Sequence, residues 1–292
     1  MARMEQWDDF RYQEGARRAT AAKATLDSAA NRILLETKAR VWDPSGATSA
    51  DRIALDQASG DFRAEGHVAS SQKQDQKRPK SGMLSGEEPV QAIAAGMTSR
   101  NRNQLIRYEG DAVVWQAANR IKAESVEIDR EARRLVAQGK VETQLLEKGE
   151  KGGKTGGLTT VKAAAMVYTE SDRLAHYTGG AGMVRQGMRV KSSELRAVLA
   201  DKDASSSLET AYADGQVEIV QSERDRTRTG SSEHAEYYAG EDKVILRGGS
   251  PQLTDTLKGT THGRELTYFA GDDRLMVNGV PDKPATSRLR RK

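Results

Sequence analysis

The sequence contains no cysteine, which excludes disulfide bonds, thiolate catalysis and cysteine-ligated zinc. Aromatic residues are also sparse, at 5% of the 292 residues, and hydrophobic residues of all kinds reach only 36%. This composition leaves too little apolar volume for a thick, three-layer enzyme core. It favours a thin, extended architecture in which each strand keeps one face in water.

Long apolar runs are missing as well, so no segment could cross a bilayer as a helix. The first ten residues, Met1–Phe10, lack the apolar centre that a signal peptide needs. Because the repeat described below begins almost at once, we expect the chain to lack its true N-terminus and any signal or anchor segment. The net charge is +4, but lysine and arginine alternate with acidic residues nearly everywhere, which argues against nucleic-acid binding. The basic tail Arg288–Lys292 is interpreted as a frayed terminus.

A repeat of about thirty residues runs through the chain. An apolar residue stands two positions before each anchor of the repeat, as Ile53 stands before Leu55, and another generally follows seven positions after it. Glycine is usual four positions further on, with Thr37 as the exception. The anchors are Leu26, Leu55, Ile128, Tyr168, Tyr237 and Tyr268, and the glycines are Gly66, Gly139, Gly248 and Gly279 with Gly179 slightly displaced.

The chemistry of one repeat unit predicts a pair of strands. Apolar residues two apart place their side chains on one face of a strand. Polar, glycine-containing segments follow the anchors, such as Asp56–Gly60, Ala239–Lys243 and Ala270–Arg274, and they read as hairpin turns. The glycine of the returning strand fits a bulge or a bend. Since turns and glycines interrupt every stretch before three helical turns could form, the sequence predicts an all-β fold.

No motif predicts catalysis or a cofactor. Gly149–Gly157 resembles a phosphate-binding loop, but the spacing of its glycines is wrong and no apolar helix follows it. The four histidines are far apart in the sequence, so they offer no local metal pair. Most acidic residues lie at turns, where capping of the backbone explains them. We therefore expect a protein without catalytic residues, metal or cofactor.

The stretch Gly110–Asp129 resembles the OstA-like (LptA) repeat. That family's pattern combines a glycine, alternating apolar residues, a glutamine, an asparagine and a small residue before the next strand. The matching positions are Gly110, Ala112, Val114, Gln116, Asn119, Ile121, Ala123, Val126 and Ile128. Further copies match at Ala50–Asp56 with Phe62–Val68, at 235–251 and at 268–279.

The resemblance implies an open, V-shaped β-jellyroll or β-sandwich built from antiparallel strand repeats. It also implies a non-enzymatic periplasmic protein that shields lipid A acyl chains while lipopolysaccharide passes from the inner to the outer membrane. Its partners would be lipopolysaccharide, other bridge components joined by edge-strand addition, and further copies of the chain end to end. The residues expected to face the lipid groove are Ile53, Leu55, Phe62, Val126, Ile128, Leu135, Met166, Tyr168, Tyr237, Leu266, Tyr268 and Leu275.

Polar inserts divide the expected fold. We predict a first OstA-like module over residues 1–146 with a polar loop at 70–104, a flexible linker or loop at 147–160, a second module over 161–281 and a basic tail at 282–292. Residues 221–232 are predicted to form a further exposed loop. The length fits either a fused double module or the C-terminal part of a longer, anchored protein.

Two other functions remain open. The same repeat could fill the dry core of a structural β-solenoid, such as an adhesin or scaffold. A polysaccharide-processing enzyme would need two carboxylates that converge in a cleft. The shape of the interior separates the first of these from a lipid carrier, since a scaffold needs a closed, packed interior and a carrier needs an apolar cleft.

Overall fold

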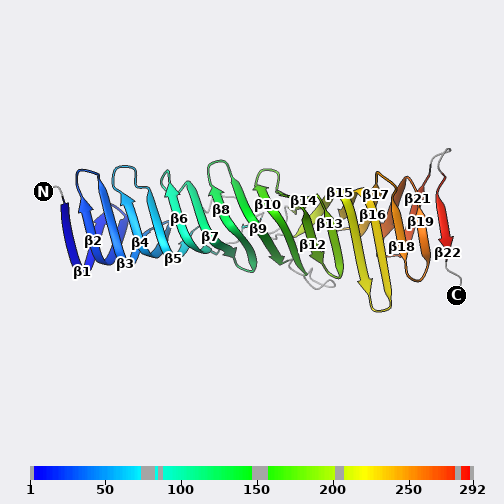
Figure 1. Cartoon of the computed structure of the whole chain (residues 1–292), viewed down its shortest axis with the longest axis horizontal. Coiled ribbons are helices and arrows are strands. Elements are labelled where there is room, and N and C mark those ends of the chain that lie inside the picture. Colours follow the sequence, from blue (N-terminus) through cyan, green and yellow to red (C-terminus); the bar gives the residue numbers. More distant parts are fainter. Residues whose placement is uncertain are drawn as a thin grey trace. The chain divides into compact units, whose positions relative to one another are not determined.

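The structure is a computed structural model, and it describes residues 3–73, 83–84, 88–146, 157–200, 207–279 and 284–289. These residues form 22 β-strands and no helix, which confirms the all-β prediction (Figure 1). No described segment is a helix of the length and hydrophobicity needed to span a membrane.

The chain divides into two compact units, the first made of residues 1–80 and 84–141 and the second of residues 81–83 and 142–292. Strand β9 (Arg134–Leu146) begins in the first unit and ends in the second. The other strands of the first unit are β1 (Arg3–Glu14), β2 (Arg17–Asp27), β3 (Arg32–Asp43), β4 (Gly46–Asp56), β5 (Phe62–Gln72), β6 (Val90–Arg100), β7 (Leu105–Gln116) and β8 (Asn119–Asp129). Those of the second are β10 (Leu158–Thr169), β11 (Leu174–Thr178), β12 (Ala181–Arg185), β13 (Met188–Ser192), β14 (Glu194–Leu199), β15 (Leu208–Glu223), β16 (Arg226–Tyr238), β17 (Lys243–Arg247), β18 (Gln252–Asp255), β19 (Gly259–His262), β20 (Glu265–Phe269), β21 (Arg274–Asn278) and β22 (Thr286–Leu289).

In the first unit, strands β1 to β8 form an antiparallel meander, and the register shifts in the middle of each pair. Between β3 and β4, for example, Glu36 pairs with Arg52 and Ala39 with Ala50, so Thr37 and Lys38 of β3 oppose Asp51 alone. Such a two-against-one bulge bends the sheet. Each strand therefore contributes one half to each of two arms.

The bend needs residues with positive φ, and this explains the repeated glycine. In β5 the bend consists of Gly66 at φ 76° and His67 at φ 47°. A Cβ atom at Gly66 would lie 2.2 Å from the Asp51 carboxylate of β4, so the position favours glycine. The exceptional Thr37 adopts the same bend with Lys38, at φ 63° and 54°. The predicted bulge or bend is thus confirmed, both at glycine positions and at Thr37, where glycine is absent.

In the second unit many strands are broken where the first unit only bends them. Strands β11 and β12 are separated by Gly179 and Gly180, both at positive φ, and they pair with the two halves of β10. Long strand β15 keeps the bend at Gly215 and Gln216, with φ of 77° and 49°. One arm contains β11, β14, β17, β20 and β21, and the other contains β12, β13, β18, β19 and β22.

Several loop predictions need correction. The segment 70–104 contains all of β6, whose inward face is buried and mainly apolar. The exposed loop predicted for 221–232 is wrong, because β15 and β16 form a hairpin there and Arg228 is 5% exposed. The arginines of this hairpin pair with acidic residues that are close in space, so they need no full exposure to water. The predicted hairpin turns at 56–60, 239–243 and 270–274 are confirmed. Most of the predicted linker, 147–156, lies outside the described residues, β10 already begins at Leu158, and the predicted tail contains β22.

Candidate functional site

The candidate site is the interior of each unit, between its two arms. Within both units, buried and exposed residues alternate along the strands, so one face of each arm points inward. Ten of the twelve residues predicted to face a groove are buried there: Ile53, Leu55, Phe62, Val126, Leu135, Met166, Tyr168, Tyr237, Leu266 and Tyr268. The other two, Ile128 and Leu275, are half-buried.

All twelve predicted residues lie on one arm of their unit, which we call the anchor arm. The strand register aligns them in rows, with Leu55 opposite Phe62 and Tyr268 opposite Leu275. The large aliphatic and tyrosine side chains that define the repeat therefore all lie on the anchor arm. The sequence therefore located one wall of the interior.

The opposite arm was missed as a wall. In the first unit its inward residues include Thr48, Ser70, Ala92, Val114 and Ile121, all at most 4% exposed. Thr48, Ser70 and Ala92 have small or hydroxyl side chains, which give a weak hydrophobic pattern, so the repeat did not mark these three. Val114 and Ile121 match the OstA-like pattern on either side of Gln116 but were not assigned to the groove, and the strand register places them opposite each other on the inward face.

Buried tyrosines connect the two arms. In the first unit, the Tyr108 hydroxyl on the anchor arm donates a hydrogen bond to Ser70 Oγ on the opposite arm, at 3.1 Å. Burial raises the pKa of Tyr108 to about 12, so this hydroxyl keeps its proton. Nearer the strand ends, Arg130 donates to Gln72 Oε1 at 3.4 Å. These contacts hold the arms of the first unit together.

The second unit repeats this arrangement twice. The hydroxyls of Tyr177 on the anchor arm and Thr143 on the opposite arm share a hydrogen bond of 2.8 Å, and burial raises the pKa of Tyr177 well above its usual value. Arg185 Nη1 donates to the Tyr237 hydroxyl at 2.6 Å, and that hydroxyl donates to Asp242 Oδ1 at 3.0 Å. We call the contacts of Tyr108, Tyr177 and Tyr237 the tyrosine bridges.

An apolar cavity remains inside the C-terminal half of the second unit. Its anchor-arm wall includes the predicted residues Leu266 and Tyr268, and the Arg228 guanidinium lies at its edge. The other lining residues are Met188, Ile219, Gln221, Gly230, Val244, Leu246 and Leu253. Both arms thus contribute to a space whose walls are almost entirely hydrocarbon.

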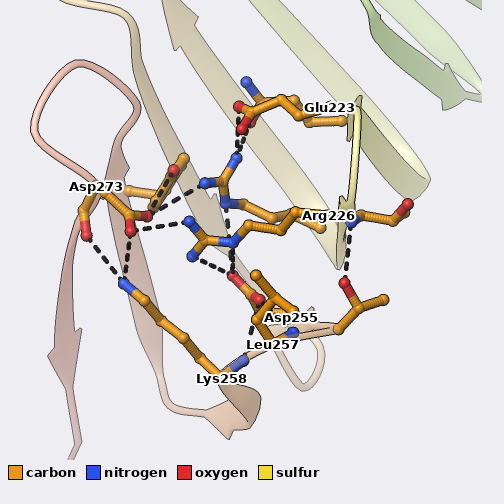
Figure 2. Close-up of polar contacts among 11 residues, drawn as sticks. Glu223, Arg226, Asp255, Leu257, Lys258 and Asp273 are labelled. Atoms are coloured by element: carbon orange, nitrogen blue, oxygen red, sulfur yellow. Dashed lines mark hydrogen bonds and ion pairs between the residues drawn. The ribbon is translucent and has the colours of Figure 1, made fainter.

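A charged cluster stands beside this cavity, at the ends of the strands (Figure 2). Asp273, in the β20–β21 turn of the anchor arm, lies 2.9 Å from Arg226 Nη1, 3.3 Å from Arg228 Nη2 and 2.7 Å from Lys258 Nζ. Asp255, at the end of β18 on the opposite arm, pairs with Arg226 Nε at 2.7 Å. The cluster therefore joins the arms electrostatically where the tyrosine bridges join them by hydrogen bonds.

The same cluster bears on the enzyme alternative. Asp255 and Asp273 are two carboxylates that converge near a cavity, as a glycosidase would require. The Arg226 side chain lowers the pKa of Asp273 far below its usual value, and it also favours the ionised form of Asp255, whose pKa is lowered. Neither carboxyl group can then hold the proton that a general acid delivers at neutral pH. This pair is suited to binding cations, and it does not support hydrolysis.

The described residues contain no group of three or more histidine or acidic side chains that could hold a metal ion. Three histidines each lie beside a carboxylate near the bend of the sheet: His67 with Asp51 at 2.8 Å, His176 with Glu194 at 3.0 Å and His234 with Asp214 at 2.6 Å. Since these pairs are at least partly exposed and stand outside the interior, they are surface contacts.

Comparisons with known proteins find a family likeness over part of the chain. Residues 90–203 match the family described as LptA/(LptD N-terminal domain) LPS transport protein, which confirms the OstA-like resemblance over those residues. A crystal structure of LptH, the LptA homologous periplasmic component of the lipopolysaccharide transport device from Pseudomonas aeruginosa, aligns with 12% identity and a TM-score of 0.38. The alignment covers 45% of this chain and 92% of that one. No curated protein matches the chain.

Proposed function

Because residues 90–203 match the LptA/LptD N-terminal family of lipopolysaccharide-transport proteins, we propose that this chain is a non-enzymatic carrier of lipopolysaccharide. Its site of action is the periplasm, where LptA-like proteins work. Lipid A acyl chains lie between the arms, and sugars and phosphates stay outside. The matched residues include Val126, Ile128, Leu135, Met166 and Tyr168 of the anchor arm.

The composition of the interior supports this proposal. Acyl chains make no directional contacts, and the inward faces offer mainly aliphatic, alanine and threonine side chains. Each methylene group removed from water contributes about 0.8 kcal/mol, so several acyl chains would be held without any specific polar contact. The apolar cavity beside Leu266 and Tyr268 is a place where an acyl chain could begin to enter the interior.

Loading of lipid requires the arms to part. In the structure Ile53, Leu55, Val126 and Met166 are fully buried against other side chains. Acyl chains would replace these neighbours, so the apolar burial lost between the arms is regained against the lipid. Acyl chains cannot replace the hydrogen bonds of the tyrosine bridges or the ion pairs of the charged cluster, which opening breaks.

The first strand is suited to edge-strand addition. Among the described residues β1 pairs only with β2, and its other edge offers unpaired backbone groups. Met4 and Trp7 of this strand are 45% and 63% exposed. Another bridge component or a second copy of the chain would extend the sheet here by backbone hydrogen bonds.

A second candidate function, a structural scaffold with a dry core, is favoured by one observation. The interior is largely closed, with large side chains such as Leu35, Ile53, Tyr108 and Tyr177 at most 1% exposed. A scaffold needs only that state, whereas a carrier must also reach an open one. The family match favours the carrier.

Site-specific photo-crosslinking separates the two candidates. We would place a photo-reactive residue at Ile128, which points inward and is half-buried, and in a matched control at Glu127, which pairs with Arg107 on the outer face. Each protein is irradiated in lipopolysaccharide-producing cells. The carrier predicts an adduct with lipopolysaccharide at Ile128 and none at Glu127. A folded, correctly localised protein that gives no adduct at Ile128, Val126 or Ile53 would leave the scaffold as the function.

A further inference from the structure

The charged cluster beside the apolar cavity combines groups from both arms of the second unit. Arg226, Arg228 and Lys258 come from the opposite arm, on β16 and in the β18–β19 turn. Asp273 comes from the anchor arm, in the turn between β20 and β21. Figure 2 shows the Asp273 turn reaching toward the two guanidinium groups and the Lys258 ammonium. Within the part of the cluster that the structure describes, Asp273 is therefore the acid that crosses between the arms.

The two aspartates of the cluster differ in how firmly they are held. Asp255 accepts hydrogen bonds from the backbone amides of Leu257 and Lys258, at 2.9 and 3.1 Å, so it is part of its own turn. Its side chain is 8% exposed. The side chain of Asp273 is 37% exposed and accepts only side-chain donors, including the Tyr268 hydroxyl at 3.1 Å. Asp273 is the exchangeable acid of the cluster.

Removal of Asp273 would leave a site with the properties of an anion receptor. Three cations, Arg226, Arg228 and Lys258, would then face two carboxylates, Asp255 and Glu223, which gives a net charge of +1. The Arg228 side chain is 6% exposed, and its Nε donates no hydrogen bond within the described residues. Guanidinium groups present their donors in a fork that matches the oxygens of a phosphate. A phosphate has more acceptor oxygens than the carboxylate that it would displace.

The cavity specifies the rest of the ligand. Arg228 and Tyr268 belong to both features, since they line the cavity and contact Asp273. The cavity holds only about 30 Å³, so a hydrocarbon tail that enters it must push the lining side chains apart, and its head would then lie at the cluster. Charge and hydrophobicity together select an amphiphile with an anionic head and an acyl tail.

We propose that Arg226, Arg228 and Lys258 bind the phosphomonoester head of an acyl-chain lipid in exchange for Asp273, and that this exchange releases the anchor arm of the second unit. The inference deepens the proposed function, on which it rests. Binding of the head frees the β20–β21 turn. Leu266 and Tyr268 move with the turn because they lie in β20, which leads into it. The lipid head thus releases the arm that covers the cavity into which the acyl tail enters.

Exchange predicts that removal of the competing charge strengthens lipid binding. We would compare the whole protein with its Asp273→Asn variant for binding of lysophosphatidic acid below its critical micelle concentration, by isothermal titration calorimetry. Asp273→Asn should bind roughly tenfold more tightly, the effect of one charge-assisted hydrogen bond to Asp273 that no longer has to be broken. The matched control is Asp272→Asn in the same turn, because among the residues that the structure describes the exposed Arg274 is the one side chain that pairs with Asp272, at 3.1 Å. It should bind as the unmodified protein does.

A second variant tests the receptor itself. Lys258→Met removes a cation whose side chain is 57% exposed, so the fold should tolerate it, and it should weaken lysophosphatidic acid binding by roughly tenfold. Monoacylglycerol, with the same tail and no phosphate, should bind to Lys258→Met with the same affinity as to the unmodified protein. Equal affinities of Asp273→Asn and Asp272→Asn for lysophosphatidic acid would overturn the exchange. So would inorganic phosphate that binds as tightly as the lipid, because the cavity would then contribute nothing.

The binding test and the crosslinking test of the proposed function can fail independently of each other. A lipopolysaccharide adduct at Ile128 together with an unresponsive Asp273→Asn variant leaves the carrier standing and removes the exchange. Conversely, a responsive Asp273→Asn variant without an adduct at Ile128 removes transport through the first unit and keeps a phospholipid site in the second.

Discussion

The bend of the sheet provides a quantitative test of the fold, at Gly110 in β7. Gly110 has φ of 80°, and a Cβ atom built on it would lie 2.6 Å from the Cβ of Ala95 in the neighbouring strand β6. Substitution by alanine thus adds two costs. A left-handed backbone costs a non-glycine residue about 1 kcal/mol. The added methyl group would also strike the Ala95 methyl group, which is exposed but has no rotamer that avoids the contact, and this costs about 1–3 kcal/mol more.

The chain offers a control that carries only the first cost. Gly15, in the β1–β2 turn, has φ of 56°, and its Cβ position has nothing within 4 Å. We expect Gly15→Ala to lower the free energy of unfolding of the first unit by about 1 kcal/mol and Gly110→Ala by about 2–4 kcal/mol. Urea unfolding followed by circular dichroism measures both, compared as shifts of the midpoint at unchanged slope.

A double mutant isolates the steric part. Ala95→Gly removes the methyl group that Gly110→Ala would strike. The double mutant should therefore regain the free energy lost to the clash and keep only the cost of the positive φ. The coupling energy should be about 1–3 kcal/mol. Equal losses in Gly15→Ala and Gly110→Ala, or additive effects of Gly110→Ala and Ala95→Gly, would refute the close approach of β6 and β7 at the bend.

Two further predictions concern the contacts between the arms of the second unit. Tyr177→Phe leaves the Thr143 hydroxyl buried without its partner, so it should lower the free energy of unfolding by about 1–3 kcal/mol in urea titrations, and Tyr177→Phe with Thr143→Val should recover part of that loss. The pKa of Asp273 is depressed below its usual 3.8, so its ion pairs stabilise the fold fully above that value and the stabilisation is lost as the pH falls toward the depressed pKa. The thermal unfolding midpoint of Asp273→Asn should therefore lie below that of the unmodified protein at pH 7 and approach it below pH 3.8, and a constant difference across this range would contradict the ion pairs with Arg226 and Lys258.

The repeat made the fold predictable from the sequence because the same backbone bend recurs in each repeat unit. The bend at Gly66 and His67 follows the bend at Thr37 and Lys38 by 29 residues, which is also the spacing of the anchors Leu26 and Leu55. A fixed distance between turn and bend keeps the same side chains on the inner face of successive strands. The repeat therefore predicts side chains that face inward, and ten of the twelve are buried.

The opposite arm and the charged cluster were not predictable in this way. Alternation marks an inner face only where its residues are large and apolar, and Thr48 or Ser70 give no such contrast. Arg226 and Arg228 were read as part of an exposed loop because their neutralising partners, Asp255 and Asp273, lie 27 to 47 positions away in the sequence. Pairing over such distances depends on which turns the two arms bring together, and local sequence does not specify that.

The energies of the contacts between the arms bear on whether a closed interior can serve a carrier. A buried hydrogen bond contributes about 0.5–1.5 kcal/mol net, so the two tyrosine bridges of the second unit, at Tyr177 and Tyr237, contribute about 1–3 kcal/mol together. Burial of about four methylene groups of an acyl chain offsets that loss. The apolar contacts between the arms do not enter the balance to first order, because lipid replaces them with contacts of the same kind. The closed interior then acts as a resting state that an acyl chain of ordinary length can open, whereas a molecule with only a few methylenes cannot. A threshold in chain length is expected for a carrier and not for a scaffold, and a series of lysophosphatidic acids with increasing acyl length, titrated against the whole protein, would reveal whether one exists.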